Sequence, residues 1–256
     1  MPLTPLAIDP PMHPLDNIRV ILVEPEFQGN IGSAARALKT MGLSQLWVVN
    51  PACEPRGVEA VRMAHNSNDL LQQVRVVDRL EQALADTSFS VATTRRVRKQ
   101  QSPYFNPEEA ARLVVERGSG GPVALVFGRE SSGLTNPELE MCSVQSTIAA
   151  ATENQSLNLA QAVMVYTYAI YQASLMPTER SFQWRLAAHD EQEQFYAHLA
   201  TTLKILGARP ATTMDNYIAR FRRVISRMPL ESRDVRLLRK ILTRMNAVAA
   251  GQSIGQ

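Results

Sequence analysis

The chain of 256 residues is long enough for one sizeable core and a smaller second unit. Hydrophobic residues make up 45% of it and charged residues 20%, a composition that excludes a wholly disordered protein. The two cysteines, Cys53 and Cys142, are too few for a disulfide framework and show no Cys/His spacing typical of metal ligands. We therefore expect a globular protein of a reducing compartment that binds no metal.

The N-terminal segment and the longest apolar stretch bear on cellular location. Residues 157–176 are apolar but interrupted by polar side chains, which fits a buried helix better than a membrane span. Five prolines and no Lys or Arg occur in the first fourteen positions, so residues 1–16 are predicted to be a disordered leader and not a signal peptide. We predict a cytoplasmic protein without membrane contact.

The net charge of +3 is unevenly distributed along the chain. Residues 176–256 hold thirteen Lys and Arg against seven Asp and Glu, whereas residues 1–175 hold fourteen against seventeen. A basic C-terminal third suggests a polyanionic partner. Arg outnumbers Lys by 23 to 4, which suits phosphate recognition, although a biased genomic base composition would give the same ratio.

Short apolar runs alternate with helical patterns in the first two thirds of the chain. Strands are predicted at residues 18–24, 45–50, 74–77, 89–93, 123–128 and, less clearly, 144–149. Helices are predicted between them at residues 33–41, 78–85, 106–117 and 135–141, the last two with capping signals at Asn106 and Thr135. Strands alternating with helices predict an α/β fold with a mostly parallel sheet that is covered on both faces.

A long helix is predicted at residues 157–175, and it carries two apolar stripes. Val163, Tyr166 and Ile170 form one stripe; the other consists of Met164, Tyr168, Tyr171 and Leu175. The core of one chain or a core plus a partner subunit would bury both stripes, and we favour the partner.

A wholly helical unit follows a polar linker at residues 177–187. Its helices are predicted at residues 191–206, 214–228 and 231–249. The expected organisation is thus a domain at residues 17–176 and a small all-helical extension at residues 188–256.

Three segments at the ends of predicted strands contain unusual residues. Residues 29–36 (GNIGSAAR) are read as a loop with Asn30 and Ser33 at a helix N-terminus and Arg36 on the first turn, a pattern that suits an anion or an ordinary turn. Residues 128–135 (GRESSGLT) space two glycines as in a P-loop but lack its lysine, and GxGxxG is absent, which argues against an NTPase or a nicotinamide dehydrogenase. Residues 154–158 (NQSLN) offer Ser156 as a helix N-cap.

In this order, NxGSxxR, VFGxExxGL and SLN resemble the three motifs of the SPOUT methyltransferases. Within that superfamily the chain is most similar to the bacterial tRNA (cytidine/uridine-2′-O)-methyltransferases that act at anticodon-loop position 32. The resemblance implies methylation of that ribose with S-adenosylmethionine. The alternatives are a SPOUT 2′-O-methyltransferase for rRNA or another tRNA position, and a non-catalytic RNA-binding protein on the same scaffold.

The resemblance also implies a fold and a cofactor site. The C-terminal part of the parallel-sheet domain would be threaded into a trefoil knot, and two chains would form a homodimer. Three loops would wrap S-adenosylmethionine, largely through backbone groups that glycine and small residues leave accessible. The cofactor-binding residues would be Thr93, Thr94, Arg95, Gly128, Gly133, Ile148, Gln155, Ser156 and Leu157. Gln155 departs from the small polar residue that is frequent in relatives, which puts only its side-chain role in doubt.

The catalytic residues implied by the resemblance are centred on Arg36. Because the pKa of arginine lies above about 12, we interpret Arg36 as an electrostatic clamp on the developing alkoxide and a neighbouring phosphate, not as the base. Proton removal is left to the phosphate or to water. The residues that would orient Arg36 and the ribose are Asn30, Glu130, Ser156 and Asn158.

RNA binding is predicted independently from the basic residues. Arg95, Arg96, Arg98 and Lys99 follow a strand beside the expected cofactor loop, although such a run is usually just solvated. In the helical unit the candidates are Arg220, Arg223 and Arg227 on one helix, and Arg236 and Lys240 on the last. Amphipathic helices with basic outer faces suit a folded RNA such as tRNA, which is recognised by its shape and backbone.

Overall fold

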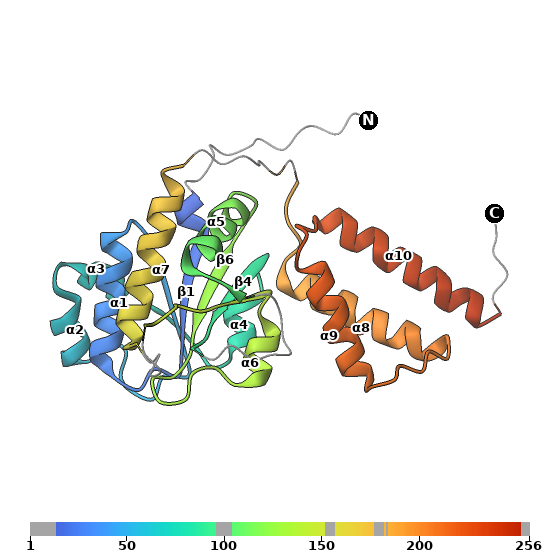
Figure 1. Cartoon of the computed structure of the whole chain (residues 1–256), viewed down its shortest axis with the longest axis horizontal. Helices are drawn as coiled ribbons and strands as arrows, with labels where there is room; N and C mark the ends of the chain where they lie inside the picture. The colour runs from blue at the N-terminus through green and yellow to red at the C-terminus, as the bar shows by residue number, and fades with distance from the viewer. Residues whose placement is uncertain (1–13, 96–103, 152–156, 177–181, 183, 252–256) are drawn as a thin grey trace.

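The structure is a computed structural model that describes residues 14–95, 104–151, 157–176, 182 and 184–251. Within this part of the chain, seven strands form one sheet in the order β3-β2-β1-β6-β4-β7-β5 (Figure 1). They are β1 (Ile18–Val23), β2 (Gln45–Val49), β3 (Arg75–Val77), β4 (Phe89–Thr93), β5 (Tyr104–Phe105), β6 (Val123–Phe127) and β7 (Val144–Ser146). Every pairing between these strands is parallel. The predicted α/β class is confirmed, and six of the strands lie within three residues of their predicted ends.

Helices cover both faces of the sheet, and each face has its own apolar core. The helices are α1 (Gln28–Thr40), α2 (Val58–Ala64), α3 (Asn68–Gln72), α4 (Leu80–Leu84), α5 (Pro107–Gly118), α6 (Asn136–Met141) and α7 (Leu159–Ser174), with short 3-10 turns η1 (Pro14–Asn17) and η2 (His65–Ser67). Val20 and Leu22 of β1 pack in the core under α1, α5 and α7, whereas Ile21 and Val23 pack in the opposite core with α4 and α6. This alternation follows from the two-residue period of a strand.

Helix α1 begins five residues earlier than the sequence predicts. The segment 29–36 is therefore not a loop, and Ser33 is not at a helix N-terminus. The reason is packing: a Cβ on Gly32 would lie 2.0 Å from the Ala60 carbonyl oxygen of α2, so glycine lets the two helices approach closely. Because α1 starts at Gln28, Arg36 lies on its third turn and not on its first.

The start of the described chain and the end of the predicted linker are both ordered. Leu15 of η1 is buried in the core, so ordered structure is present before residue 17, where we expected it to begin. Leu186 and Ala187 were assigned to the linker but are buried, and the Leu186 amide donates a hydrogen bond to the Gly120 carbonyl at 3.4 Å. Residues 1–13, 177–181 and 183 lie outside the described chain.

The C-terminal unit consists of α8 (His189–Ile205), α9 (Met214–Ile225) and α10 (Ser232–Ala249), which form a separate cluster beside the sheet (Figure 1). Its core contains Phe195 and Tyr196 of α8, Ile218 of α9 and Leu242 of α10. The three predicted helices are present, but α9 ends at Ile225, so Arg227 does not share a helix with Arg220 and Arg223 as expected.

Among the described residues, no helix combines the length and apolar character needed to span a membrane.

Candidate functional site

A hollow lies where the carboxyl ends of β4 and β6 meet the first turns of α7. Thr93 closes β4, Gly128 follows β6, and Leu159 and Tyr166 of α7 complete the wall. In open α/β sheets, ligands bind at the carboxyl ends of the strands. The position of the hollow is therefore that of a ligand site.

Most of the predicted cofactor residues line this hollow. They are Thr93, Thr94, Arg95, Gly128, Gly133, Ile148 and Leu157. Gln155 and Ser156, the remaining two, lie outside the described residues. The hollow also has an apolar wall that was not predicted, made by Phe127, Leu134, Leu159, Ala162 and Tyr166. Phe127 and Leu134 belong to the motif VFGxExxGL itself, and the other three follow SLN on the predicted long helix, so the sequence contained a signal for this wall.

The segment 128–134 folds tightly on itself at one side of the hollow. A Cβ on Gly128 would lie 2.2 Å from the carbonyl carbon of Gly133, so no larger residue fits there. Gly133 has a φ of +73°, and its amide donates a hydrogen bond to the Arg129 carbonyl at 2.9 Å. Both glycines are thus required by the turn itself. With both polar backbone groups and an apolar wall, the hollow suits a ligand with an aromatic base and a polar end, such as S-adenosylmethionine.

Three of the predicted catalytic residues form a continuous chain of hydrogen bonds. The Asn30 amide donates to Glu130 Oε1 at 2.6 Å, and the Glu26 backbone amide donates to Glu130 Oε2 at 2.9 Å. The Asn158 side chain in turn donates to Asn30 Oδ1 at 2.9 Å. The buried Asn30 therefore has both ends of its amide fixed, one by each neighbouring motif.

Asn158, and not Ser156, is the N-cap of α7. Its Oδ1 accepts hydrogen bonds from the amides of Ala160 at 2.9 Å and Gln161 at 3.3 Å. The Gln161 side chain accepts one from the Asn158 amide, which completes a capping box. Sequence alone left Ser156 as the candidate because it offered no evidence that α7 starts at Leu159.

Arg36 lies apart from this chain of hydrogen bonds. Its side chain is exposed and does not line the hollow, and within the described residues its guanidinium makes no hydrogen bond or ion pair. The structure thus brings Asn30, Glu130 and Asn158 together but leaves Arg36 two turns further along α1, free for another partner.

Tyr166 is a buried wall residue whose hydroxyl is held by a hydrogen bond. Its hydroxyl donates to Ser146 Oγ at 2.7 Å, and its ring lies edge-on to Phe127 with the centroids 5.6 Å apart. Burial raises the pKa of Tyr166 to about 12, so the phenol stays protonated near neutral pH.

Among the described residues, no group of three or more His, Cys, Asp or Glu is placed to hold a metal ion.

The predicted RNA-binding residues differ in their exposure and in whether their side chains already contact other residues. Arg95 is exposed at the rim of the hollow, and Arg220, Arg223, Arg227 and Lys240 are exposed in the helical unit. The exposed Arg236 donates from Nε to the Ser232 carbonyl at 3.3 Å. Arg222 is different, because its guanidinium pairs with Glu193 and lies 4.4 Å from the Tyr196 ring centroid. Arg96, Arg98 and Lys99 lie outside the described chain.

The family model of the SpoU rRNA Methylase family matches residues 17–168. The chain belongs to this family. A second model, the C-terminal domain of the tRNA methyltransferase TrmJ, matches residues 190–254 in the helical unit. The resemblance that the three motifs suggested is therefore confirmed.

Relatives named TrmJ resemble this SpoU methylase over nearly its whole length. The tRNA (cytidine/uridine-2′-O-)-methyltransferase TrmJ of Klebsiella pneumoniae is 39% identical over 244 residues, which cover 93% of the chain and 100% of that protein. The crystal structure of TrmJ from Z. mobilis ZM4 is 30% identical, with a TM-score of 0.73, and the match covers 89% of the chain and 98% of that structure. The SpoU methyltransferase AviRb of Streptomyces viridochromogenes, solved with AdoMet, is 22% identical over 62% of the chain and 61% of its own, with a TM-score of 0.51, and shares the fold.

Proposed function

We propose that the chain transfers a methyl group from S-adenosylmethionine to the ribose 2′-hydroxyl of cytidine or uridine at position 32 of tRNA. The observation that carries this proposal is the bonded set Glu130–Asn30–Asn158, of which Glu130 lines the hollow, because it joins all three motifs of a SpoU methylase in one place. The relatives named TrmJ support tRNA as the substrate and cytidine or uridine as the nucleotide. Position 32 rests on the motif resemblance.

S-adenosylmethionine would be held by the residues that line the hollow. Phe127, Leu134 and Tyr166 offer apolar surface to the adenine, and Thr93 and Gly128 offer backbone groups where the chain comes close. When bound, the cofactor supplies an electrophilic methyl group on its sulfonium. This enzyme's own residues must then present the ribose oxygen in line and lower the cost of its developing negative charge.

The acceptor side is assigned to Arg36 and the bonded set. Because the Arg36 guanidinium has no partner among the described residues, it is available to clamp an RNA phosphate and the developing alkoxide. Glu130 and Asn158 fix the amide of Asn30, which lies on the same helix as Arg36 and can orient the ribose. Ser156 retains the orienting role that the resemblance implies. The proton leaves to the phosphate or to water, since Arg36 stays charged.

The basic residues of the helical unit would bind the tRNA backbone. Arg220 and Arg223 of α9 and Lys240 of α10 are exposed and form no ion pair within the described chain, so they can neutralise phosphates. Arg227 and Arg236 would add to this surface. Arg95 and the run to Lys99 would contact phosphates beside the reacting nucleotide.

The working unit is proposed to be a homodimer built on α7. Val163, Tyr166 and Ile170 of one stripe are buried, whereas the second stripe is open to solvent. Its members are Met164 at 37% exposure, Tyr168 at 53%, Tyr171 at 38% and Leu175 at 61%. An apolar stripe left exposed on a folded chain is typical of an interface. The trefoil knot and the cytoplasmic location are proposed with the same function.

The function is tested by incubating the purified protein with labelled S-adenosylmethionine and either unmodified tRNA or rRNA. After digestion to nucleosides, we expect label in 2′-O-methylcytidine or 2′-O-methyluridine from tRNA. Label only in rRNA would support the alternative methyltransferase. Binding of tRNA without any transfer would support the non-catalytic alternative.

A further inference from the structure

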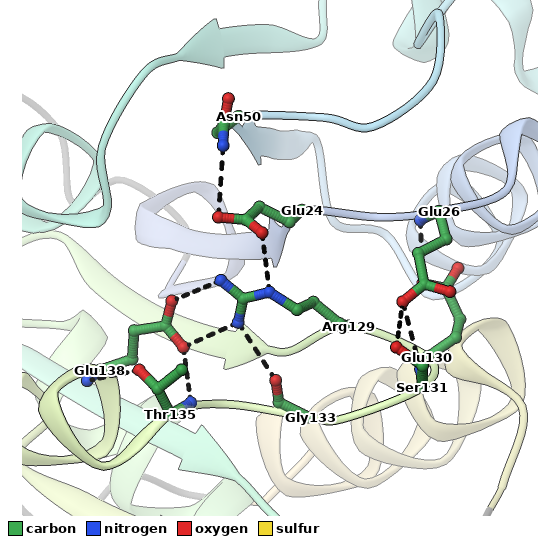
Figure 2. Close-up of polar contacts among 9 residues, drawn as sticks. All are labelled: Glu24, Glu26, Asn50, Arg129, Glu130, Ser131, Gly133, Thr135 and Glu138. Atoms are coloured by element: carbon green, nitrogen blue, oxygen red, sulfur yellow. Dashed lines mark hydrogen bonds and ion pairs between the residues drawn. The ribbon is translucent and has the colours of Figure 1, made fainter.

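The loop after β6 carries an ion-pair network that the proposed chemistry does not itself use. Arg129 donates from Nε to Glu24 Oε2 at 2.8 Å and, through its two terminal nitrogens, to both oxygens of Glu138 at 3.0 Å (Figure 2). One terminal nitrogen also donates to the Gly133 carbonyl at 3.3 Å. One guanidinium thus ties together the end of β1, the start of α6 and the loop 128–134.

The Arg129–Glu138 pair of this network is more enclosed than an ordinary surface ion pair. The side chains of Arg129 and Glu138 are 17% and 14% exposed, whereas those of the Arg62–Glu59 pair on α2 are 71% and 46% exposed. Arg129 holds the pKa of Glu24 below its usual range through its hydrogen bond. Burial acts most strongly on Glu138 and raises its pKa, but the hydrogen bonds from Arg129 and Thr135 and the attraction to Arg129 together lower that pKa. A two-pronged pair of this kind fixes orientation as well as position.

The backbone around the network is strained in a way that needs such support. Glu24 and Asn50, which follow β1 and β2, have φ values of 46° and 42°. Residues other than glycine rarely adopt this left-handed backbone conformation. The Asn50 side chain donates to Glu24 Oε1 at 3.2 Å, on the carboxylate that Arg129 also holds. Strained residues persist where surrounding contacts over-determine them, and they cluster at functional sites.

Arg129 and Glu130 are consecutive, and their side chains leave the loop in opposite directions (Figure 2). Arg129 reaches Glu24 and Glu138, while Glu130 accepts from Asn30 and from the Glu26 amide. Ser131 adds a hydroxyl bond to the Glu26 carboxylate. Because Arg129 also forms the bridge to Gly133 that closes the loop, its anchorage fixes the backbone from which Glu130 projects.

We propose that Arg129 is a positioning residue for methyl transfer, which holds the Glu130 carboxylate against Asn30 by anchoring the loop 128–134 to the ends of β1 and α6. Arg129 also lines the hollow, but its guanidinium is held by Glu24, Glu138 and the Gly133 carbonyl, so its effect on the reaction passes through Glu130. This inference rests on the proposed function. If the unaltered protein fails to methylate tRNA, the function fails; if it methylates and Arg129 proves dispensable, only this inference fails.

The test compares kcat and KM in Arg129→Lys, Arg129→Gln and Glu130→Gln. The double variant combines Arg129→Gln with Glu130→Gln. A misplacement of about 1 Å at a catalytic constellation costs about 100-fold, so we expect kcat to fall by about that factor in Arg129→Gln. Arg129→Lys should also fall, because an ammonium cannot make the two-pronged bond. KM for tRNA should stay within a few-fold. The double variant should be no slower than Glu130→Gln alone, since both changes disturb the same group.

Arg19→Lys is the matched control. Arg19 is more buried, at 3% exposure, and it makes a similar two-pronged pair with Asp86 at 2.8 and 3.0 Å, but it lies at the amino end of β1, away from the hollow. Arg19→Lys should lower Tm without changing kcat below the transition. Arg129 variants that lower Tm yet keep the kcat of the unaltered protein would overturn the proposal. Losses that multiply in the double variant would overturn it as well.

Discussion

Asn158 combines a structural and a positioning contact in one side chain. Its Oδ1 caps α7, and its Nδ2 donates to Asn30. Asp is as good an N-cap as Asn and suits the positive end of the helix dipole, but its carboxylate has no proton to donate. The two contacts can therefore be separated by substitution.

We predict that Asn158→Asp keeps the stability of the unaltered protein but loses most methyl transfer, because Asn30 is no longer held from that side. Asn158→Ala should lose activity and also about 1 kcal/mol of stability with the cap. Thermal unfolding and initial rates of methyl transfer would measure the two effects. Full activity in the Asn158→Asp variant would show that the bond to Asn30 has no role.

Arg36 is the residue on which the acceptor chemistry depends. We predict that Arg36→Ala lowers kcat by about 100-fold or more, as for loss of an electrostatic stabiliser, and leaves affinity for S-adenosylmethionine unchanged because Arg36 does not line the hollow. Arg36→Lys should fail too if the planar fork is needed. Calorimetric titration of the cofactor and single-turnover rates would test this. A normal rate in Arg36→Ala would remove it from the mechanism.

The residues of the site were largely predictable, but the way they connect was not. Asn30, Glu130 and Asn158 were identified from motifs, and the structure bonds them together. Arg129 was not predicted as a site residue because its position depends on a hydrogen-bonded ion pair with Glu24, which is 105 residues away in sequence. Local pattern carries no information about such a pair.

Among the elements, α1 shows where local propensity misleads. Gly29 and Gly32 disfavour a helix, which is why the sequence predicts its start at Ser33. Close packing of Gly32 against Ala60 of α2 outweighs that preference. The short helices α2 and α3 were not predicted: neither has a side-chain hydrogen bond at its N-cap, whereas the similarly short α6 is marked by its capping residue Thr135. The buried strands were predictable because buried parallel strands are short continuous apolar runs, whereas β5, with two residues, was not predicted.

Helix α7 carries the prediction about assembly. Met164→Glu combined with Tyr168→Glu places charges on its exposed stripe and should give monomers, with activity falling as the dimer content falls. Val58→Glu is the matched control, because Val58 is an apolar residue of α2 with 87% exposure. Light scattering and methyl-transfer rates on the same samples would report both properties. A fully active monomer would contradict the dimer.

At the scale of the whole molecule, the excess of basic residues lies in the helical unit, whereas the proposed catalytic residues lie in the sheet domain. Catalysis and tRNA binding can therefore be changed separately by substitution. Substituting glutamine for Arg220 and Arg223 removes two positive charges. It should raise KM for tRNA without changing the affinity for S-adenosylmethionine. The slope of log affinity against log salt should become shallower by about 1 to 2, as expected for the loss of two phosphate contacts. Arg75→Gln with Arg112→Gln removes the same charge from exposed positions in β3 and α5 and should change neither. If the two pairs of substitutions raised KM for tRNA equally, tRNA binding would depend on net charge alone.

The central claim is that one ribose of tRNA is methylated at the site of Glu130, Asn30 and Arg36. It is tested most directly with two tRNA transcripts that differ only in a 2′-deoxy nucleotide at position 32, each incubated with the protein and labelled S-adenosylmethionine. The account predicts one 2′-O-methyl group at position 32 of the all-ribose transcript and no label in the deoxy transcript. Equal labelling of the two transcripts would contradict it.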